Sequence, residues 1–397
     1  MSKIVVVGAG ASGIIAALKA SLNNEVILID GNDKCGKKIL VTGNGKCNYW
    51  NESINVNNYF TNDTKRLDCI LENKNEVLDY LYSIGIYPKV KNGYYYPASN
   101  LAASIRKIFV NELTRCNVKT LYDSRVINIK KLDNKFIIET PKETLKADKV
   151  IIATGSKAFP KTGSDGFGYD AAKKLGHKIN QVLPALVGLQ TNDINIKEWA
   201  GVRSDASVSL YVDNQRLTEE FGEIQLTENG ISGICTFNIS GLISKALYNK
   251  KKVIVRINFV PAINNFADFF DKRNSELKNR TIEELLESIL NYKLTSVILK
   301  KSNIKNNSYW NDLNRLEKEM LIRNIENFEL NISETNSYDK AQVCTGGIPL
   351  NEVSNNMESI YCKDLYFVGE LLDVDGKCGG FNLAFAFITG YIAGSSV

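Results

Sequence analysis

Residues 3–30, KIVVVGAGASGIIAALKASLNNEVILID, contain the pattern that decides the fold. Residues 3–7 form a short apolar run rich in β-branched side chains, which is typical of a buried strand. A glycine-rich turn and an alanine-rich segment that ends near Asn23 follow, and this pattern indicates a helix. A second apolar run at 26–29 stops at Asp30. The stretch therefore predicts strand, glycine turn, helix and strand, which together make one parallel βαβ unit.

The glycine turn has the GxGxxG spacing, with Gly8, Gly10 and Gly13 as its glycines. The first glycine allows a tight turn, the second lets a pyrophosphate approach the backbone, and the third lets helix and strand pack closely. The helix N-terminus offers N–H groups and a partial positive charge to the phosphates. Asp30 is placed to accept hydrogen bonds from the ribose of an adenosine, and its charge disfavours a 2′-phosphate. The unit predicts dinucleotide binding, but it does not distinguish FAD from NAD.

Length and composition describe an ordinary folded protein with more than one domain. The chain has 397 residues, of which 44% are hydrophobic and 23% charged, and a single core usually stops growing below this length. The net charge of +5 is spread among acidic residues, so we do not expect nucleic acid as a partner. No stretch approaches the ~18 apolar residues of a membrane span. The first strand begins at Lys3 and leaves no room for a secretion signal, so we predict a cytoplasmic protein.

The cysteines and the single histidine argue against two kinds of site. Eight cysteines are scattered without a CxxC or CxxxxC pair, so we expect free thiols and no dithiol relay of the kind that flavin disulfide reductases use. The single His177 excludes a multi-histidine metal site, and its position after the helix end AAKKLGH favours a structural role. No metal is predicted.

The first half of the chain continues with helices and then strands. Apolar positions three and four apart predict helices around 64–84 and 99–115. A small β-meander and a fully apolar strand are predicted next, at 118–130, 135–140, 143–146 and 149–153.

Beyond about residue 187 the pattern changes. Polar–apolar alternation, as in SVSLYV and KKVIVRINFV, indicates antiparallel strands with one wetted face. From about 267 to 330 the sequence is strongly helical and charged, and an apolar run returns at 365–368. We therefore expect 188–340 to be an insertion between the two sequence halves of one nucleotide-binding domain.

Four segments resemble the motifs of one protein family. GKKILVTGNGKCN (36–48) is similar to its GKK..-TGxGRCN segment, NGYYYPASNLAASI (92–105) to its GrxFPxSxxAxSV helix entry, and ADKVIIATGSKAFPKTGSDGFGYDAAKKLGH (147–177) to its ATG signature. The closing segment GGIPLNEV...MES...LYFVGELLDVDGKCGGFNLAFAFITGYIAG is the most specific match. The chain resembles the HI0933-like flavoproteins, also called the BaiN or aminoacetone-oxidase-like family of bacterial FAD-dependent NAD(P) oxidoreductases. Lys46 stands where the family has Arg, so any contact made there lacks the planar bidentate fork.

The resemblance implies an α/β fold with an FAD-binding Rossmann-like (two-dinucleotide-binding-like) domain, an inserted antiparallel β-domain and a small helical subdomain. The FAD-binding domain would comprise 1–187 and 341–397, the β-rich substrate domain 188–266, and the helical subdomain 267–340. FAD would be bound noncovalently, and NADH or NADPH would be the candidate electron donor.

The βαβ unit and the resemblance together identify the residues expected to hold FAD. The glycine turn and Asp30 would bind the ADP half, residues 36–48 would run beneath the cofactor, and the Gly369-Glu370 pair would bind the ribityl chain. The helix opened by 379–382 would direct its N–H groups at flavin N1 and O2. The full expected set is Gly8, Gly10, Ala11, Ser12, Gly13, Asp30, Gly31, Lys38, Gly43, Gly45, Cys47, Asn48, Val126, Ala153, Thr154, Gly155, Gly369, Glu370, Asp373, Gly379, Gly380, Phe381, Asn382 and Leu383.

Residues 221–233, FGEIQLTENGISG, resemble the family's GELLFTHxGLSGP segment with two departures. Glu228 replaces the His, and Ile234 replaces the Pro that ends the motif. If this loop faces the ring, Glu228 could donate a proton or bind an amine substrate, and the alternative is an exposed turn acid. No other catalytic residue is identified, because flavin N5 carries the chemistry.

Three functions remain open from the sequence. The leading hypothesis is NAD(P)H-linked hydride transfer to an activated C=C bond of a hydrophobic keto-substrate of the steroid or bile-acid type. The second is oxidation of a small amine such as aminoacetone with production of hydrogen peroxide, which the lack of a second GxGxxG unit favours. The third is a non-catalytic FAD-binding or sensing protein.

Overall fold

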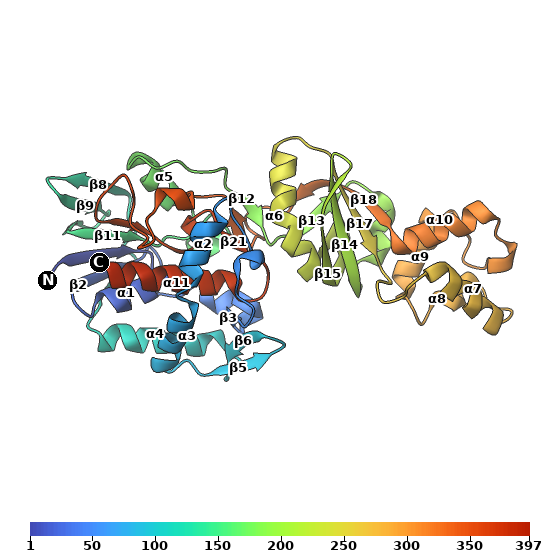
Figure 1. Ribbon diagram of the computed structural model, residues 1–397, viewed down its shortest axis with the longest axis horizontal. Coiled ribbons are helices and arrows are strands. Elements are labelled where there is room, and N and C mark those ends of the chain that lie inside the picture. Colours follow the sequence, from blue (N-terminus) through green and yellow to red (C-terminus); the bar gives the residue numbers. More distant parts are fainter. The chain divides into compact units, whose positions relative to one another are not determined.

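The computed structural model describes residues 1–193 and 195–397. Its internal contacts divide the chain into two compact units, one formed by residues 1–183 with 342–397 and the other by residues 184–341. The range 188–340 lies inside the second unit, which runs from green to orange in Figure 1.

A five-stranded parallel sheet forms the centre of the first unit, in the order β20, β11, β1, β2, β7. Its strands are β1 (Lys3–Val7), β2 (Glu25–Ile29), β7 (Lys119–Leu121), β11 (Lys149–Ile152) and β20 (Leu365–Phe367). The three middle strands are buried almost throughout, which is why their sequences are continuous apolar runs. The C-terminal segment thus completes the sheet that the N-terminal βαβ unit begins. The predicted α/β Rossmann-type fold is confirmed.

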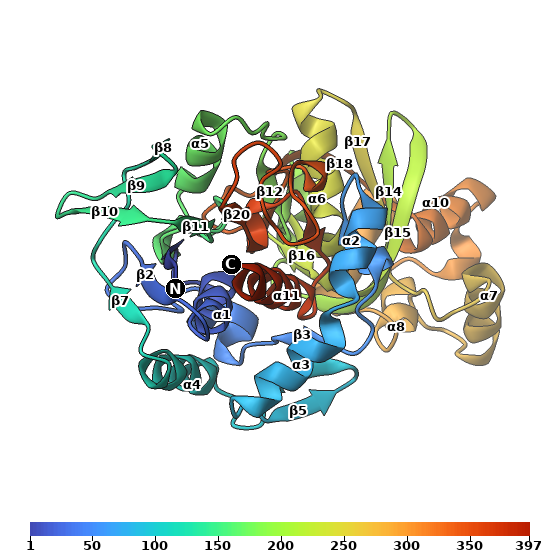
Figure 2. The same cartoon turned by 60° about the vertical axis from the view of Figure 1, so that its left-hand side comes forward.

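Helices α1 (Ala11–Ala20) and α11 (Phe381–Ser396) lie side by side in the first unit, as both views show (Figures 1 and 2). Glycine allows this close approach, because a Cβ built on Gly390 would lie only 2.3 Å from the backbone carbonyl oxygen of Ser12. A larger side chain at this point would push the two helices apart. The packing therefore holds the first turn of α1 against the C-terminal helix.

Smaller elements surround the central sheet, and two of them differ from the sequence prediction. The strand predicted at 118–130 is two strands, because β7 joins the parallel sheet and β8 starts the meander after a loop. The helix predicted at 64–84 is likewise two helices. Hydrophobic spacing marks buried positions but does not show which sheet a strand joins. The elements are β3 (Trp50–Asn51), β4 (Tyr59–Phe60), α2 (Thr64–Leu71), α3 (Lys74–Ser83), β5 (Pro88–Lys91), β6 (Tyr94–Pro97), α4 (Ala102–Arg115), β8 (Asn128–Leu132), β9 (Lys135–Glu139), β10 (Thr144–Ala147), α5 (Phe167–Lys174), β19 (Val343–Thr345) and β21 (Asp375–Gly376).

The second unit is a closed antiparallel barrel with helices packed on it. The strand order around the barrel is β13, β16, β15, β14, β17, β18. Barrel and helices share one apolar core. The last barrel strand, β18, falls within the range 267–340 expected to be a helical subdomain, so the helical segment ends at α10. The elements are β13 (Leu189–Thr191), β14 (Arg203–Val212), β15 (Gln215–Thr227), β16 (Gly230–Gly233), α6 (Ile234–Tyr248), β17 (Val253–Asn258), α7 (Phe266–Glu276), α8 (Ile282–Leu286), α9 (Tyr292–Lys301), α10 (Arg315–Glu326) and β18 (Phe328–Thr335).

Three further observations concern the described part of the chain. All eight cysteines are free thiols. None of the helices described is long and apolar enough to cross a membrane. Over residues 1–193 and 195–397, no group of three or more His, Cys, Asp and Glu side chains could hold a metal ion.

Candidate active site

The carboxyl edge of the parallel sheet gathers many of the predicted cofactor residues. Gly8 directly follows β1, Asp30 follows β2, residues 153–155 follow β11, and Gly369 with Glu370 follows β20. The carboxyl ends of parallel strands meet at one edge, and ligands of open α/β sheets bind there. Segments that are far apart in the sequence are therefore brought together.

The geometry of the first turn requires its glycines. Gly8 has a φ of +105°, and a Cβ on it would lie 2.4 Å from the carbonyl oxygen of Ala153. A Cβ on Gly13 would lie 1.8 Å from the carbonyl oxygen of Gly8. Gly10 is different, because among the described residues no atom lies within 4 Å of a Cβ built there. Gly10 also begins α1 without a side chain to cap it, so the helix N-terminus is open to a phosphate.

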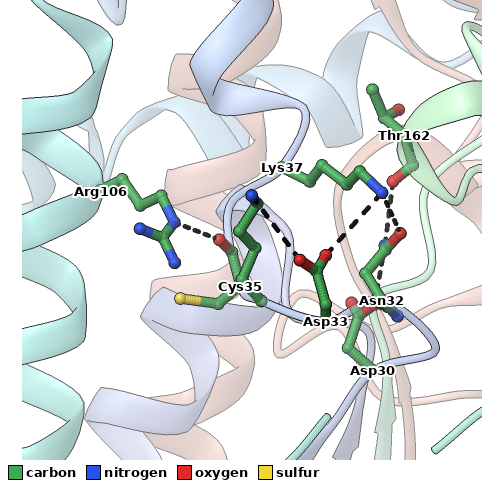
Figure 3. Close-up of polar contacts among 8 residues, drawn as sticks. Asp30, Asn32, Asp33, Cys35, Lys37, Arg106 and Thr162 are labelled. Atoms are coloured by element: carbon green, nitrogen blue, oxygen red, sulfur yellow. Dashed lines mark hydrogen bonds and ion pairs between the residues drawn. The ribbon is translucent and has the colours of Figure 1, made fainter. Parts of the chain in front are cut away.

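Asp30 is held in place by a hydrogen-bond network (Figure 3). One carboxylate oxygen accepts from the N–H of Ala9 at 2.6 Å, and the other accepts from the N–H and the side-chain Nδ2 of Asn32 at 2.7 and 2.9 Å. The same Nδ2 donates to the carbonyl oxygen of Thr162 at 3.0 Å, and Lys37 donates to the Asn32 Oδ1 at 3.2 Å. Sequence reasoning missed Asn32. The Asp-Gly-Asn order, which is typical of a turn, was the available signal.

Lys38 and Glu370 form an ion pair that joins the loop after β2 to the loop after β20. Their charged atoms are 2.8 Å apart, and each side chain is about four-fifths buried. The Ser156 hydroxyl donates to the same Glu370 oxygen at 3.0 Å, and the Tyr169 hydroxyl donates to the Glu370 carbonyl oxygen at 3.2 Å. Ser156 and Tyr169 both lie in the 147–177 segment and were not predicted.

The loop at residues 42–48 has an unusual backbone. Gly43, Asn44, Gly45 and Cys47 all have positive φ values, between +54° and +80°. Glycine adopts such values without strain, but Asn44 and Cys47 are strained, and strained positions cluster at ligand sites. Burial raises the pKa of the Cys47 thiol to about 11, so this thiol stays protonated at neutral pH and is not a nucleophile. The side-chain amide of Asn48 lies 3.1 Å from two backbone carbonyl oxygens, to which it can donate.

The first turn of α11 approaches this loop region closely. A Cβ on Gly380 would lie 2.4 Å from the carbonyl oxygen of Trp50, and the Asn51 side chain donates to the carbonyl oxygen of Gly379 at 2.8 Å. The Asn382 amide binds the N–H and the carbonyl oxygen of Gly376, both at 2.8 Å. The Asn382 side chain therefore holds the turn in shape. The helix can still contact a ligand through the backbone N–H groups of its first turn.

Three other predicted residues have different surroundings. Val126 is buried in the loop between β7 and β8. Asp373 is buried and accepts from the Asn180 side chain at 2.7 Å. Glu228 lies in the second unit, exposed in the two-residue turn between β15 and β16, which agrees with its interpretation as a turn acid.

His177 is structural, as the sequence suggested. Its ring is buried, with Nδ1 3.0 Å from a Glu352 carboxylate oxygen and Nε2 2.6 Å from the Ser359 hydroxyl. Burial lowers the pKa of His177, and the Glu352 carboxylate opposes this shift. Among the described residues, both ring nitrogens of this histidine are engaged with buried side chains, so it is not the proton donor of the site.

The residues at the sheet edge fit a noncovalently bound FAD. The turn at Gly10 leaves open space at a helix N-terminus, where a pyrophosphate binds. The buried Thr154 hydroxyl, at the end of β11, has no hydrogen-bond partner in the part of the chain that the structure describes. A buried hydroxyl is rarely left without a partner, so a ligand group is expected beside it.

Comparison with known proteins agrees with this geometry. The model of the HI0933-like protein Rossmann domain matches residues 2–396. The chain belongs to this family. It is 39% identical to the 3-dehydro-bile acid delta(4,6)-reductase of Clostridium scindens, over 99% of this chain and 98% of that protein. It is 27% identical to the ribosomal RNA dihydrouridine synthase of Escherichia coli, over 96% of this chain and 94% of that protein.

A solved structure shows the same fold at low sequence identity. The 3-ketosteroid-delta4-(5alpha)-dehydrogenase of Rhodococcus jostii superposes with a TM-score of 0.53 at 13% identity, covering 100% of this chain and 96% of that chain. The family resemblance predicted from the motifs is confirmed, and the HI0933-like chain is an FAD-dependent oxidoreductase.

Proposed function

We propose that this HI0933-like protein uses FAD and NAD(P)H to reduce a C=C bond conjugated to a ketone in a steroid or bile-acid type substrate. The observation that carries the proposal is the 39% identity to a bile-acid reductase, which extends over nearly the whole of both chains. An insertion or deletion of a domain would have broken that coverage. The match therefore extends over both compact units of this chain.

The second relative supports the type of reaction. Its name describes the formation of dihydrouridine, and dihydrouridine differs from uridine by reduction of one C=C bond conjugated to a carbonyl. A 3-keto bile acid with double bonds at positions 4 and 6 presents the same kind of bond. Two relatives with unrelated substrates thus share reduction of an activated alkene.

The residues of the chain divide the work of holding FAD, which when bound supplies the hydride. The open N-terminus of α1 at Gly10 binds the pyrophosphate, and Asp30, braced by Asn32, binds the ribose. The Lys38–Glu370 pair would contact the ribityl chain. The N–H groups at the start of α11 would hold the ring and favour negative charge on it.

The test uses purified protein loaded with FAD under anaerobic conditions. A 3-keto-4,6-diene bile acid is mixed with the enzyme and NADH or NADPH, and the product is measured by mass spectrometry. We expect a gain of two hydrogens that depends on the nucleotide. Flavin that neither nucleotide reduces, or reduced flavin that the dienone does not reoxidise, would refute the proposal.

A second candidate is reduction of uridine in ribosomal RNA, which the Escherichia coli relative favours. The modest and dispersed charge of this chain counts against RNA as the substrate. The same reduced enzyme is mixed with ribosomal RNA, and dihydrouridine is measured after digestion. Aminoacetone under air, followed by a peroxide assay, tests the amine-oxidase alternative in parallel.

A further inference from the structure

Strand β6 carries two tyrosines on one face, and both lie against the glycine loops of the cofactor site. The strand forms a small sheet with β3 and β5 (Figure 1). Tyr94 and Tyr96 occupy alternate positions and so share a face. Tyr95 points the other way, where its ring contacts the ring of Tyr49 with centroids 6.4 Å apart.

Tyr94 reaches the start of the C-terminal helix. Its Cε1 atom lies 2.5 Å from the position of a Cβ built on Gly379, so the edge of its ring covers that glycine. Tyr96 lies farther from its own neighbour, with Cε1 3.9 Å from a Cβ built on Gly43. Both phenols are half-buried, so each can still meet a substrate.

The proposed reaction needs a proton as well as a hydride. When hydride arrives at the β-carbon of an enone, negative charge passes to the α-carbon and the carbonyl oxygen, and the α-carbon must then be protonated. A positioned general acid accelerates such a step by about 10²- to 10⁴-fold. A phenol, with an ordinary pKa of about 10, keeps its proton at neutral pH and can supply it.

Three other acids near these loops are poorly suited to this step. Lys38 is engaged with Glu370, the Cys47 thiol is buried with its pKa raised by that burial, and His177 is enclosed in the core. Tyr96 has a pKa raised first by burial and then by the neighbouring Tyr94.

We infer that Tyr94 is a catalytic residue that donates the proton to the α-carbon of the substrate, an inference that rests on the proposed reduction of a conjugated C=C bond. The Tyr94 O–H bond breaks as the α-carbon C–H bond forms, while the hydride from the reduced cofactor forms the β-carbon C–H bond. The phenolate then takes a proton from water, which restores the starting state.

The test compares Tyr94→Phe with Tyr96→Phe, a matched control on the same face of the strand. Stopped-flow measurements separate reduction of the flavin by whichever of NADH and NADPH reduces the wild-type enzyme from its reoxidation by the dienone. For Tyr94→Phe we expect reoxidation to slow about 100-fold, with flavin reduction by the nucleotide and the FAD dissociation constant within about twofold of wild type. For Tyr96→Phe we expect all three quantities within about twofold of wild type.

A second measurement identifies the proton directly. In D₂O, the wild-type enzyme places deuterium on one face of the α-carbon, and Tyr94→Phe is expected to lose this facial selectivity. A structural role alone would not change the face that receives deuterium. Unchanged reoxidation and selectivity in Tyr94→Phe, loss of FAD binding in that variant, or the same defect in Tyr96→Phe would each overturn the role of Tyr94. Failure of the wild-type enzyme to reduce the dienone would instead overturn the proposed function.

Discussion

Replacing Gly10 with alanine separates cofactor binding from protein stability. Gly10 has φ −82°, which any residue adopts, and no atom of the described residues lies within 4 Å of the added Cβ. The FAD-free protein should therefore fold as before, within about 0.5 kcal/mol, or gain slightly because alanine restricts the unfolded chain. The same methyl group occupies the space through which a pyrophosphate reaches the backbone N–H groups.

The expected loss of affinity follows from those hydrogen bonds. A phosphate oxygen bonds to N–H at about 2.9 Å, whereas carbon needs about 3.5 Å from its neighbours. Two weakened hydrogen bonds to a charged group cost together about 3 kcal/mol, which raises the FAD dissociation constant roughly 100-fold.

The assay has two readings on the same samples. Thermal unfolding of the FAD-free protein measures stability, and quenching of flavin fluorescence during titration measures affinity. Gly13→Ala is the contrasting variant, because its Cβ would lie 1.8 Å from the Gly8 carbonyl oxygen and should destabilise the FAD-free fold. If Gly10→Ala bound FAD as tightly as wild type, the pyrophosphate would not lie at this turn.

Three further variants address other parts of the first unit. Asn32→Ala removes the brace on Asp30 and should raise the FAD dissociation constant about tenfold, since a hydrogen bond to a charged group contributes about 1.5–3 kcal/mol; unchanged affinity in the titration would contradict this role. Gly390→Ala places a Cβ 2.3 Å from the Ser12 carbonyl oxygen and should lower stability by about 1–3 kcal/mol in thermal unfolding, whereas an unchanged Tm would show that the helices can separate without cost. Burial lowers the pKa of His177 below its usual 6.5, so the folded state binds this proton less tightly than the unfolded state. The stability that this shift contributes is complete above about pH 6.5 and is lost as the pH falls through the folded pKa. In denaturant titrations between pH 5 and 7, His177→Gln should therefore lower the pH dependence of the free energy of unfolding. The same pH dependence in both proteins would count against this role of His177.

The sequence predicted the βαβ unit of the central sheet because its signals are local. Glycine spacing, continuous apolar strands and the acid at the end of β2 lie within thirty residues, and together they indicate a dinucleotide-binding turn. The meander was assigned less well, since strand β7 and strand β8 follow one another in the sequence but join different sheets. Pairing between distant strands depends on contacts that no local pattern contains.

The sequence predicted which loops form the candidate site, but not which side chains bind the carboxylates in those loops. Asp30 and Glu370 were identified, whereas Asn32 and Ser156, which bind their carboxylates, were not. Ser156 lies 214 residues from Glu370 in the sequence. Only the parallel order of β11 beside β20 brings the two loops together.

The placement of Tyr94 on the cofactor unit bears on how one fold can serve different substrates. Hydride and proton must reach adjacent carbons in every reduction of a conjugated C=C bond, whether the carbonyl belongs to a steroid or to a uracil ring. A proton donor on β6 beside Gly379 would keep a constant relation to the flavin, because Tyr94 and the residues expected to hold FAD belong to the same compact unit. Residues elsewhere in the chain that select the substrate can then change without affecting the transfer of hydride and proton. If the steroid fails and ribosomal RNA is reduced instead, Tyr94→Phe should still slow reoxidation and leave flavin reduction by the nucleotide intact, because the donor acts on the bond that the two substrates share.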